Sequence, residues 1–461
     1  MTYPIHTRVQ HARRWRAQAA TLATAPFLAL ANYTLPLGFP HDIGFGAAPD
    51  AATRSWLLSG AAIGITVTLI PTGQLADRVG PRRVLQFGSA ALVCTLLLSS
   101  ASPSAPTLVA ARVLAGLASG AVLSASLGCV PQIAATRTQL GTATRLWGAM
   151  IGAGIAVGPL FALVADGPGA WRVGFGFLAG GQLLLLLTTG MTIPSAGPST
   201  RGSSRLEFDL VGAILLALAL GTGLYGLMSL RQSSPAIPVF AIAVGLLLLV
   251  ALVALELRRE RRGLSVVFPV SRLHQPAFLL PTAQSAILGF SLVSFMNYFG
   301  VWAAQSGSFD PAVVAAAVLV SAGTSVFASL IAPRWVSRTW YDVRVDWVVG
   351  FGLCAIGIAT FVLTDPTIAT ILSAFFVSGA GLGILNAALA RDSLRAVPVA
   401  EAGLGAGVNN ASRYLGNAIG TAALTATGAG LTISTPAMVA GGAALLGALL
   451  SWPGGRTTTS S

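Results

Sequence analysis

The sequence predicts an all-α membrane protein with fourteen membrane-spanning helices, arranged as two six-helix bundles plus two inserted helices. The first observation is composition: 9% of the 461 residues are charged and 54% are hydrophobic, and the mean hydropathy is +0.77. A soluble chain would carry about a quarter charged residues. The second observation is a series of long apolar runs, and the third is the placement of the arginines between them. This much apolar surface cannot all be buried inside the protein, so we expect much of it to face lipid.

The apolar runs define the expected helices, because crossing a bilayer takes about 20 predominantly apolar residues. By that length the chain contains fourteen spans. They cover residues 17–37, 54–76, 83–101, 106–130, 142–165, 171–193, 208–229, 236–256, 277–303, 311–333, 345–364, 367–390, 402–429 and 435–452.

The arginines predict which ends of the spans face the cytoplasm. All 27 basic residues are arginine, and with a cytoplasmic N-terminus 22 of them fall on the inner side. Arg54, Arg172 and Arg231 fall on the outer side, in loops or at the outer ends of spans, and Arg112 and Arg413 fall deeper within spans. The positive-inside rule predicts this asymmetry, so we expect a multi-pass protein of the cell membrane with both termini in the cytoplasm. Because this topology also explains the net charge of +13, we expect no nucleic acid partner.

Two polar connections predict the domain organisation. Residues 194–205 are rich in Pro, Gly and Ser, and residues 258–272 are basic. They divide the chain into an N-terminal six-helix bundle (1–193), a linker with an inserted helix pair (194–262) and a C-terminal six-helix bundle (263–461). Two six-helix halves are typical of secondary transporters, whose substrate site lies between the halves near the membrane midplane.

Three motifs carry a family resemblance. Between the second and third spans the chain reads GQLADRVGPRR, from Gly73 to Arg83. Its glycines allow helix ends to turn tightly, and it resembles the signature loop of the major facilitator superfamily. The stretch around Arg112 resembles the helix-4 motif of that superfamily, and the glycines from Gly148 to Gly158 resemble its helix-5 motif, which is associated with antiporters. With fourteen spans, the chain resembles the drug/proton antiporter (multidrug efflux) family.

The resemblance implies a gate. In the superfamily the loop packs under the opposite half, so its counterpart here would be the start of the thirteenth span, near Ala402 and Gly403. The expected gating residues are Gly73, Asp77, Arg78, Gly80, Arg82, Arg83, Gly154, Gly158 and Pro159. Two alternatives stay open: Asp77 could serve only as a capping and topology residue, and the helix-5 glycines could form a plain packing face.

Polar and aromatic residues within spans predict the substrate cavity. The candidates are Asn32, Tyr33, Thr34, Gln284, Asn297, Tyr298, Asn386, Asn409, Asn410 and Arg413. Counted from Gly403 by the helical rise, Arg413 is expected about 15 Å deep, near the membrane midplane. It is either a clamp between helices or a residue with a substrate or coupling role. Arg112 either snorkels to the outer headgroups or faces a cavity. With two intramembrane arginines, the cavity favours neutral, amphipathic or anionic cargo over cations.

One departure from the family concerns coupling. The related exporters usually carry an aspartate in helix 1, whereas this chain reads LANYTLPLGFP and has Ala31 at that place. None of the fourteen acidic residues is expected near mid-membrane, so Arg112 and Asp42, at the mouth of helix 1, are the remaining coupling candidates. The resemblance implies proton antiport by alternating access, exporting small amphipathic or hydrophobic molecules such as drugs and metabolites. The alternative is a proton-uncoupled exporter or facilitator of metabolites.

Other function classes lack their residues in this sequence. The four histidines lie in tails or loops, and none of them forms a pair of catalytic base and nucleophile. We therefore do not expect an enzyme. No GxxxxGK[ST] loop is present. The three cysteines are scattered singly, which predicts neither a metal site nor a disulfide. We expect no cofactor. The expected partners are a small-molecule substrate, membrane lipid and, as the family resemblance implies, protons. We expect the protein to act as a monomer.

Overall fold

The computed structural model describes residues 5–39, 43, 51–164, 167, 169–195, 209–230, 236–307, 309–339, 344–428 and 433–451, and it contains no strand within them. The helices are α1 (Ile5–Thr34), α2 (Ala51–Val79), α3 (Pro81–Ala101), α4 (Ala105–Ile133), α5 (Arg137–Val164), α6 (Ala170–Thr192), α7 (Leu210–Ser229), α8 (Ala236–Arg261), α9 (Pro276–Leu288), α10 (Ser294–Ser306), α11 (Pro311–Thr339), α12 (Arg344–Leu363), α13 (Ile368–Arg395), α14 (Ala402–Thr427) and α15 (Ser434–Ser451). Short helical turns are η1 (Leu35–Gly38), η2 (Val270–His274), η3 (Gly289–Val293) and η4 (Val399–Glu401).

The number of long helices agrees with the expected number. The π-helical turn η3 joins α9 to α10 without a break, so the described residues form fourteen long helices. Eleven helices in that part of the chain are long and apolar enough to cross a membrane.

The helix boundaries differ most from the expected spans at the start of the first helix and at the end of α11, and α5, α8 and α13 also extend beyond their expected spans. The first helix begins at Ile5, twelve residues before the expected span, and α11 continues to Thr339. An α-helix continues as long as each backbone N–H bonds the carbonyl four residues earlier. The length of an apolar run measures only the part of the helix that lies in lipid. Hydropathy therefore underestimates helices that extend beyond the bilayer.

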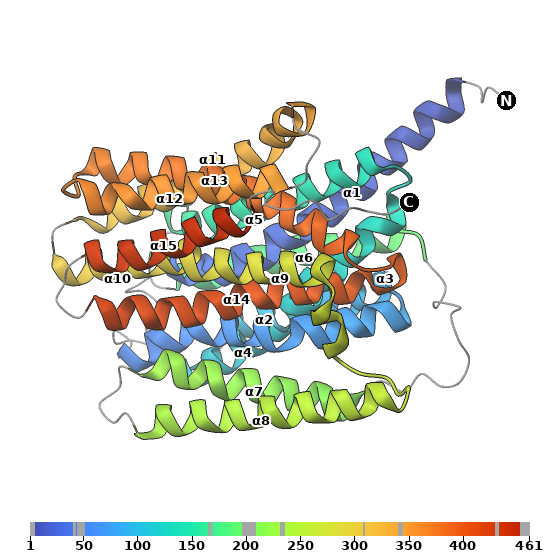
Figure 1. Ribbon diagram of the computed structural model, residues 1–461, viewed down its shortest axis with the longest axis horizontal. Helices are drawn as coiled ribbons and strands as arrows, with labels where there is room; N and C mark the ends of the chain where they lie inside the picture. The colour runs from blue at the N-terminus through green and yellow to red at the C-terminus, as the bar shows by residue number, and fades with distance from the viewer. Residues whose placement is uncertain are drawn as a thin grey trace.

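The inserted pair α7 and α8 lies at the edge of the molecule. Figure 1 shows these two helices packed along one side of the bundle, at the bottom of the view. The pair reaches the bundle through α7, where Tyr225 stacks on Trp56 of α2 with ring centroids 5.6 Å apart. The pair therefore flanks α2 and does not separate the first six helices from the last six.

The buried apolar residues form two clusters. One is built mainly from α1–α6 and includes Trp147 and Phe175. The other is built from α9–α15 and includes Phe299, Phe361 and Phe375. We call α1–α6 the first half and α9–α15 the second half. We call the end of the bundle at which α2, α8 and α13 finish the basic end.

Candidate functional site

The two halves are joined at the basic end by Asp77. Its carboxylate oxygens accept hydrogen bonds from the backbone N–H groups of Gly403 at 2.6 Å and Leu404 at 2.8 Å. The first N–H groups of a helix have no partner within the helix, and the helix dipole favours a negative charge there. Asp77 thus satisfies the start of α14, at the place that the family resemblance indicated.

Glycines allow this contact to be close. A Cβ on Gly73 would overlap the carbonyl of Gly403, and a Cβ on Gly403 would overlap the carbonyl of Gly73. Ser124 of α4 also donates to the Gly403 carbonyl, at 3.4 Å. Three helices therefore meet at one point, where two of the facing positions have room only for hydrogen.

The arginines of the loop make other contacts. Gly80 has φ of 98° and turns the chain from α2 into α3, a conformation that favours glycine. Arg82 donates to the carbonyl of Gly190 at the end of α6, at 2.6 Å, and Arg83 lies 3.5 Å from the Val79 carbonyl. In these contacts Arg82 and Arg83 stay within the first half, and Asp77 reaches across to the second half.

Arg78 lies toward the inserted helices. It is within electrostatic range of Asp209, at the start of α7, and of Arg259, near the end of α8. Asp209 itself forms an ion pair with Arg259 at 3.1 Å and caps the helix through the backbone N–H of Gly212 at 2.8 Å. The loop is thereby placed beside the charged base of α7 and α8.

A second ion pair reaches the start of α14. Arg272, in η2, lies 2.5 Å from Glu401, which directly precedes α14. Both side chains are partly exposed. The connection that follows the inserted pair is thus held against the same helix start that Asp77 contacts. Sequence reasoning did not find this pair because both partners lie in short helical turns between the long helices, and no sequence periodicity indicates that these turns approach each other.

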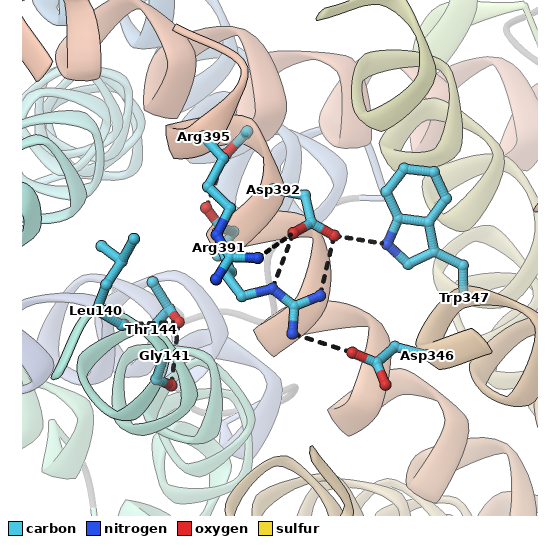
Figure 2. Close-up of polar contacts among 10 residues, drawn as sticks. Leu140, Gly141, Thr144, Asp346, Trp347, Arg391, Asp392 and Arg395 are labelled. Atoms are coloured by element: carbon cyan, nitrogen blue, oxygen red, sulfur yellow. Dashed lines mark hydrogen bonds and ion pairs between the residues drawn. The ribbon is translucent and has the colours of Figure 1, made fainter. Parts of the chain in front are cut away.

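The basic end of the second half carries a compact charge cluster (Figure 2). Arg391 of α13 pairs with Asp346 of α12 at 3.0 Å and with its neighbour Asp392 at 2.8 Å. Trp347 donates its indole N–H to Asp392 at 3.1 Å, and Arg395 lies 3.9 Å from the same carboxylate. These charges are mutually paired, so the cluster ties α12 to α13.

Arg112 is fully buried, and each of its three guanidinium nitrogens has one neutral acceptor. Its guanidinium donates to the side-chain oxygen of Asn32 at 2.5 Å, the carbonyl of Tyr33 at 3.1 Å and the carbonyl of Leu57 at 3.3 Å. It also lies 5.4 Å from the ring centroid of Phe175. The snorkelling alternative is wrong, because the Arg112 side chain has no exposed surface.

The other helix-1 candidates hold helices together. Thr34 donates to the carbonyl of Ile155 in α5 at 3.1 Å and to that of Leu30 at 3.0 Å. Asn32 also lies 3.4 Å from the Ser119 hydroxyl of α4. Through these bonds α1 is fixed to both α4 and α5.

The helix-5 glycines face both halves: Gly148 and Gly152 face α13 and α11, whereas Gly154 and Gly158 face α1. A Cβ on Gly154 would overlap the backbone of Phe27 in α1, and one on Gly158 would overlap the Thr34 hydroxyl. Pro159 lies against η1, where a Cβ on Gly38 would overlap its carbonyl. Close packing within the first half accounts for the contacts of Gly154 and Gly158, so the packing alternative fits this face of α5.

Arg413 is buried like Arg112 but is incompletely paired. Its side chain donates to the Asn386 oxygen at 2.8 Å, whereas its Nε and second terminal nitrogen have no hydrogen-bond partner. The side-chain nitrogens of Asn386 and Asn409 also lack partners. The oxygen of Asn409 accepts from the Ser285 hydroxyl. Arg413, Asn386 and Asn409 are at most 8% exposed.

Gln284 and Asp42 fall outside this group. Gln284 donates to the Gly447 carbonyl at 3.1 Å and to the Ser451 hydroxyl at 2.8 Å, which ties α9 to α15. Asp42 lies outside the described residues. Sequence reasoning included Gln284 and Arg413 in one predicted cavity because both are polar residues within spans, a criterion that does not specify the helix face.

The remaining candidates lie along α10 and α14. Asn297 donates to Asn417 at 3.0 Å and joins these two helices. Asn410 donates to the Ala406 carbonyl of its own helix at 3.0 Å. Tyr298 is buried against Gly428, near the end of α14.

Comparison with known proteins identifies the family. The sequence profile of the Major Facilitator Superfamily matches residues 19–210 and 208–421. The chain is 25% identical to the multidrug efflux pump LfrA of Mycolicibacterium smegmatis, over 89% of this chain and 80% of that protein. It is 26% identical to the probable actinorhodin transporter of Streptomyces coelicolor, over 90% and 72%. In fold it resembles the human organic anion transporter MFSD10, with a TM-score of 0.69, 13% identity and coverage of 95% and 99%. The chain belongs to the Major Facilitator Superfamily and is a membrane transporter, not an enzyme.

Proposed function

We propose that this transporter exports small amphipathic or hydrophobic organic molecules from the cell by alternating access. The names of its relatives, a multidrug efflux pump and a probable actinorhodin transporter, support small organic cargo and outward transport. In this proposal all fourteen long helices span the membrane. Residues 1–193 and 263–461 form the moving bundles, and residues 194–262 provide the linker and inserted pair.

The observation that carries alternating access is the contact of Asp77 with α14. Further contacts between the halves lie on the same side. A Cβ on Gly407 of α14 would overlap Leu69 of α2, and Ser329 of α11 donates to the Arg145 carbonyl of α5 at 2.9 Å. If the basic end is cytoplasmic, as the positive-inside rule favours, this arrangement is a state closed to the cytoplasm. Rocking the halves would break these contacts and open the inner side.

Transport is either coupled to protons or uncoupled. Proton antiport follows from the resemblance to drug/proton antiporters. Uncoupled export is favoured by the surroundings of Arg112, whose hydrogen-bond acceptors are an amide oxygen and two carbonyls. Among side chains that the structure describes, the buried carboxylates lie toward the basic end, away from Arg112. They are Asp209, Glu256, Asp346 and Asp392.

Reconstitution tests both parts of the proposal. Purified protein is placed in proteoliposomes, and transport of a panel of amphipathic fluorescent compounds is measured against protein-free liposomes, with and without a pH gradient. Transport above the protein-free rate supports export, and none for any compound contradicts it. Faster transport with the gradient supports antiport, whereas equal rates support the uncoupled alternative.

A further inference from the structure

We propose that Arg413, Asn386 and Asn409 bind the carboxylate of the transported molecule, so that the cargo is an amphipathic organic acid. This assignment rests on the proposed export function and names its substrate class. Arg413 and Asn409 lie on α14, four residues apart and thus on one helix face. Asn386 lies on α13 and is joined to Arg413 by a hydrogen bond of 2.8 Å.

The unused polar atoms of these residues are all hydrogen-bond donors. Four buried nitrogens lack a partner: two of the Arg413 guanidinium and one each of Asn386 and Asn409. An ionised carboxylate accepts hydrogen bonds and donates none, and it pairs with a guanidinium through two parallel bonds. A carboxylate thus matches both the charge and the hydrogen-bonding sense of the group, whereas a cation matches neither.

The comparison with Arg112 separates a structural arginine from a binding one. Both arginines are buried. Three nitrogens of Arg112 each donate to an acceptor supplied by α1 or α2. Arg413 has one such acceptor. An unpaired charge is costly inside a membrane protein, and such residues usually face a substrate or ion path. The missing acceptors of Arg413 are therefore the ones a ligand would supply.

The group also lies where a substrate between the halves would pass. Arg413 is the twelfth residue of the 26-residue helix α14, about 16 Å from its start by the helical rise. The first half approaches α13 at the same level, because a Cβ on Gly148 of α5 would lie 3.0 Å from the Ala387 nitrogen, next to Asn386. Toward the basic end, the contact of Gly407 with Leu69 closes α14 onto α2.

Aromatic side chains nearby suit the apolar part of such a molecule. Tyr414 directly follows Arg413 in α14, and Tyr33 lies in α1. Both tyrosines are partly buried against the hydrophobic cluster of the first half. Tyrosine offers a flat apolar face with a polar tip, which fits an aromatic or alkyl body attached to the carboxylate.

The test compares two probes that differ only in one end group, which is a carboxylate in one and a neutral amide in the other. Dansylglycine carries a carboxylate, and dansylglycinamide is its neutral counterpart. Transport of each is measured in proteoliposomes, with the rate of protein-free liposomes subtracted, for the wild type, Arg413→Gln, Arg413→Lys and Asn386→Ala. Arg258→Gln serves as a control, because it removes an exposed arginine of α8 outside this group. Binding is followed separately as the shift that each probe causes in the thermal unfolding midpoint.

We expect the wild type to prefer the acid over the amide. Arg413→Gln should lower acid transport about ten- to hundredfold, the effect of losing a charged hydrogen-bonding group, and lower amide transport much less. Arg413→Lys should retain part of the preference, because it keeps the charge without the planar fork. Arg258→Gln should retain all of it.

Several results would overturn the assignment. A wild type that prefers the amide, or an Arg413→Gln variant that loses both probes equally, would mean that Arg413 is a structural clamp. Should Arg413→Gln fail to fold, Asn386→Ala replaces it, with a selective loss of the acid expected and an unchanged preference as the contrary result. If neither probe is transported but the acid alone raises the unfolding midpoint of the wild type, the binding site is supported and the export function is contradicted. If both probes move equally well, export stands and the site fails.

Discussion

The side chains of Arg112 and Asn32 are joined by a hydrogen bond of 2.5 Å at the contact of α4 with α1. Asn32 directly follows Ala31, the position at which the family resemblance predicts an aspartate. A buried arginine is thus held by a neutral amide and not by a carboxylate. A buried charge is stabilised by charge-assisted hydrogen bonds as well as by opposite charge, and Arg112 relies on the former.

Removing the amide should destabilise the protein. Asn32→Ala leaves one nitrogen of the buried Arg112 guanidinium without an acceptor, which costs about 1 to 3 kcal/mol. The measurement is the free energy of unfolding of the purified protein in detergent. Thr95→Ala is the control, because the Thr95 hydroxyl bonds only carbonyls of its own helix. Equal destabilisation of the two variants would mean that the Arg112 to Asn32 bond adds nothing.

Replacing the same amide with a carboxylate should change the coupling. Asn32→Asp places a protonatable group against Arg112 while keeping nearly the same shape. If wild-type transport is uncoupled, we expect a pH gradient to accelerate the variant and leave the wild type unaffected, as measured in proteoliposomes. Asn297→Asp, on the α10 to α14 contact, is the matched control. A variant as insensitive to the gradient as the wild type would exclude position 32 as a coupling site.

Asp77→Asn should loosen the contact between the halves. The substitution removes the negative charge at the start of α14 and turns one of the two acceptor atoms into a donor. We expect a loss of about 1 to 2 kcal/mol from the closed state, or up to about a thirtyfold shift in the population ratio. Cysteine probes placed in the inner halves of α2 and α14 report the change as faster labelling. Arg83→Gln, which lacks this contact, is the comparison, and unchanged labelling in Asp77→Asn would exclude the latch.

Gly403→Ala tests the same contact by size. The added methyl group would overlap the Gly73 carbonyl and lie 2.8 Å from an Asp77 oxygen. Overpacking of this kind typically costs about 1 to 3 kcal/mol, and it should favour the state in which α2 and α14 are apart. Gly323→Ala in α11 is the matched control, since a Cβ there meets nothing within 4 Å. The same cysteine labelling checks the result, and similar labelling of both alanine variants would contradict it.

The sequence predicted the number of helices better than it predicted which neighbour each helix face contacts. The fourteen apolar runs correspond to fourteen long helices, because the length of an apolar run is set by the thickness of the bilayer. The contact of Asp77 with Gly403 was accessible through a family motif. The bond from Gln284 to α15 was not, since it depends on the rotation of α9, and polar residues in a span do not reveal which side of the helix they occupy.

The distinction between Arg112 and Arg413 also required the structure. Both are single arginines in apolar runs, and the sequence left structural and functional alternatives open for each. The difference lies in acceptors that come from other helices, such as the Leu57 carbonyl of α2 and the Tyr33 carbonyl of α1. Backbone acceptors have no sequence signature, because every residue carries one.

The peripheral place of α7 and α8 suggests how a chain of this kind could acquire extra helices. A hairpin of two spans returns the polypeptide to the face of the membrane that it left, so every later helix keeps its direction. The pair docks against α2 through Trp56 and Tyr225, and the hydrogen bond between Arg413 and Asn386 is formed by α13 and α14 alone. An addition that preserves sidedness and takes no part in that bond could be tolerated on arrival and adapted afterwards.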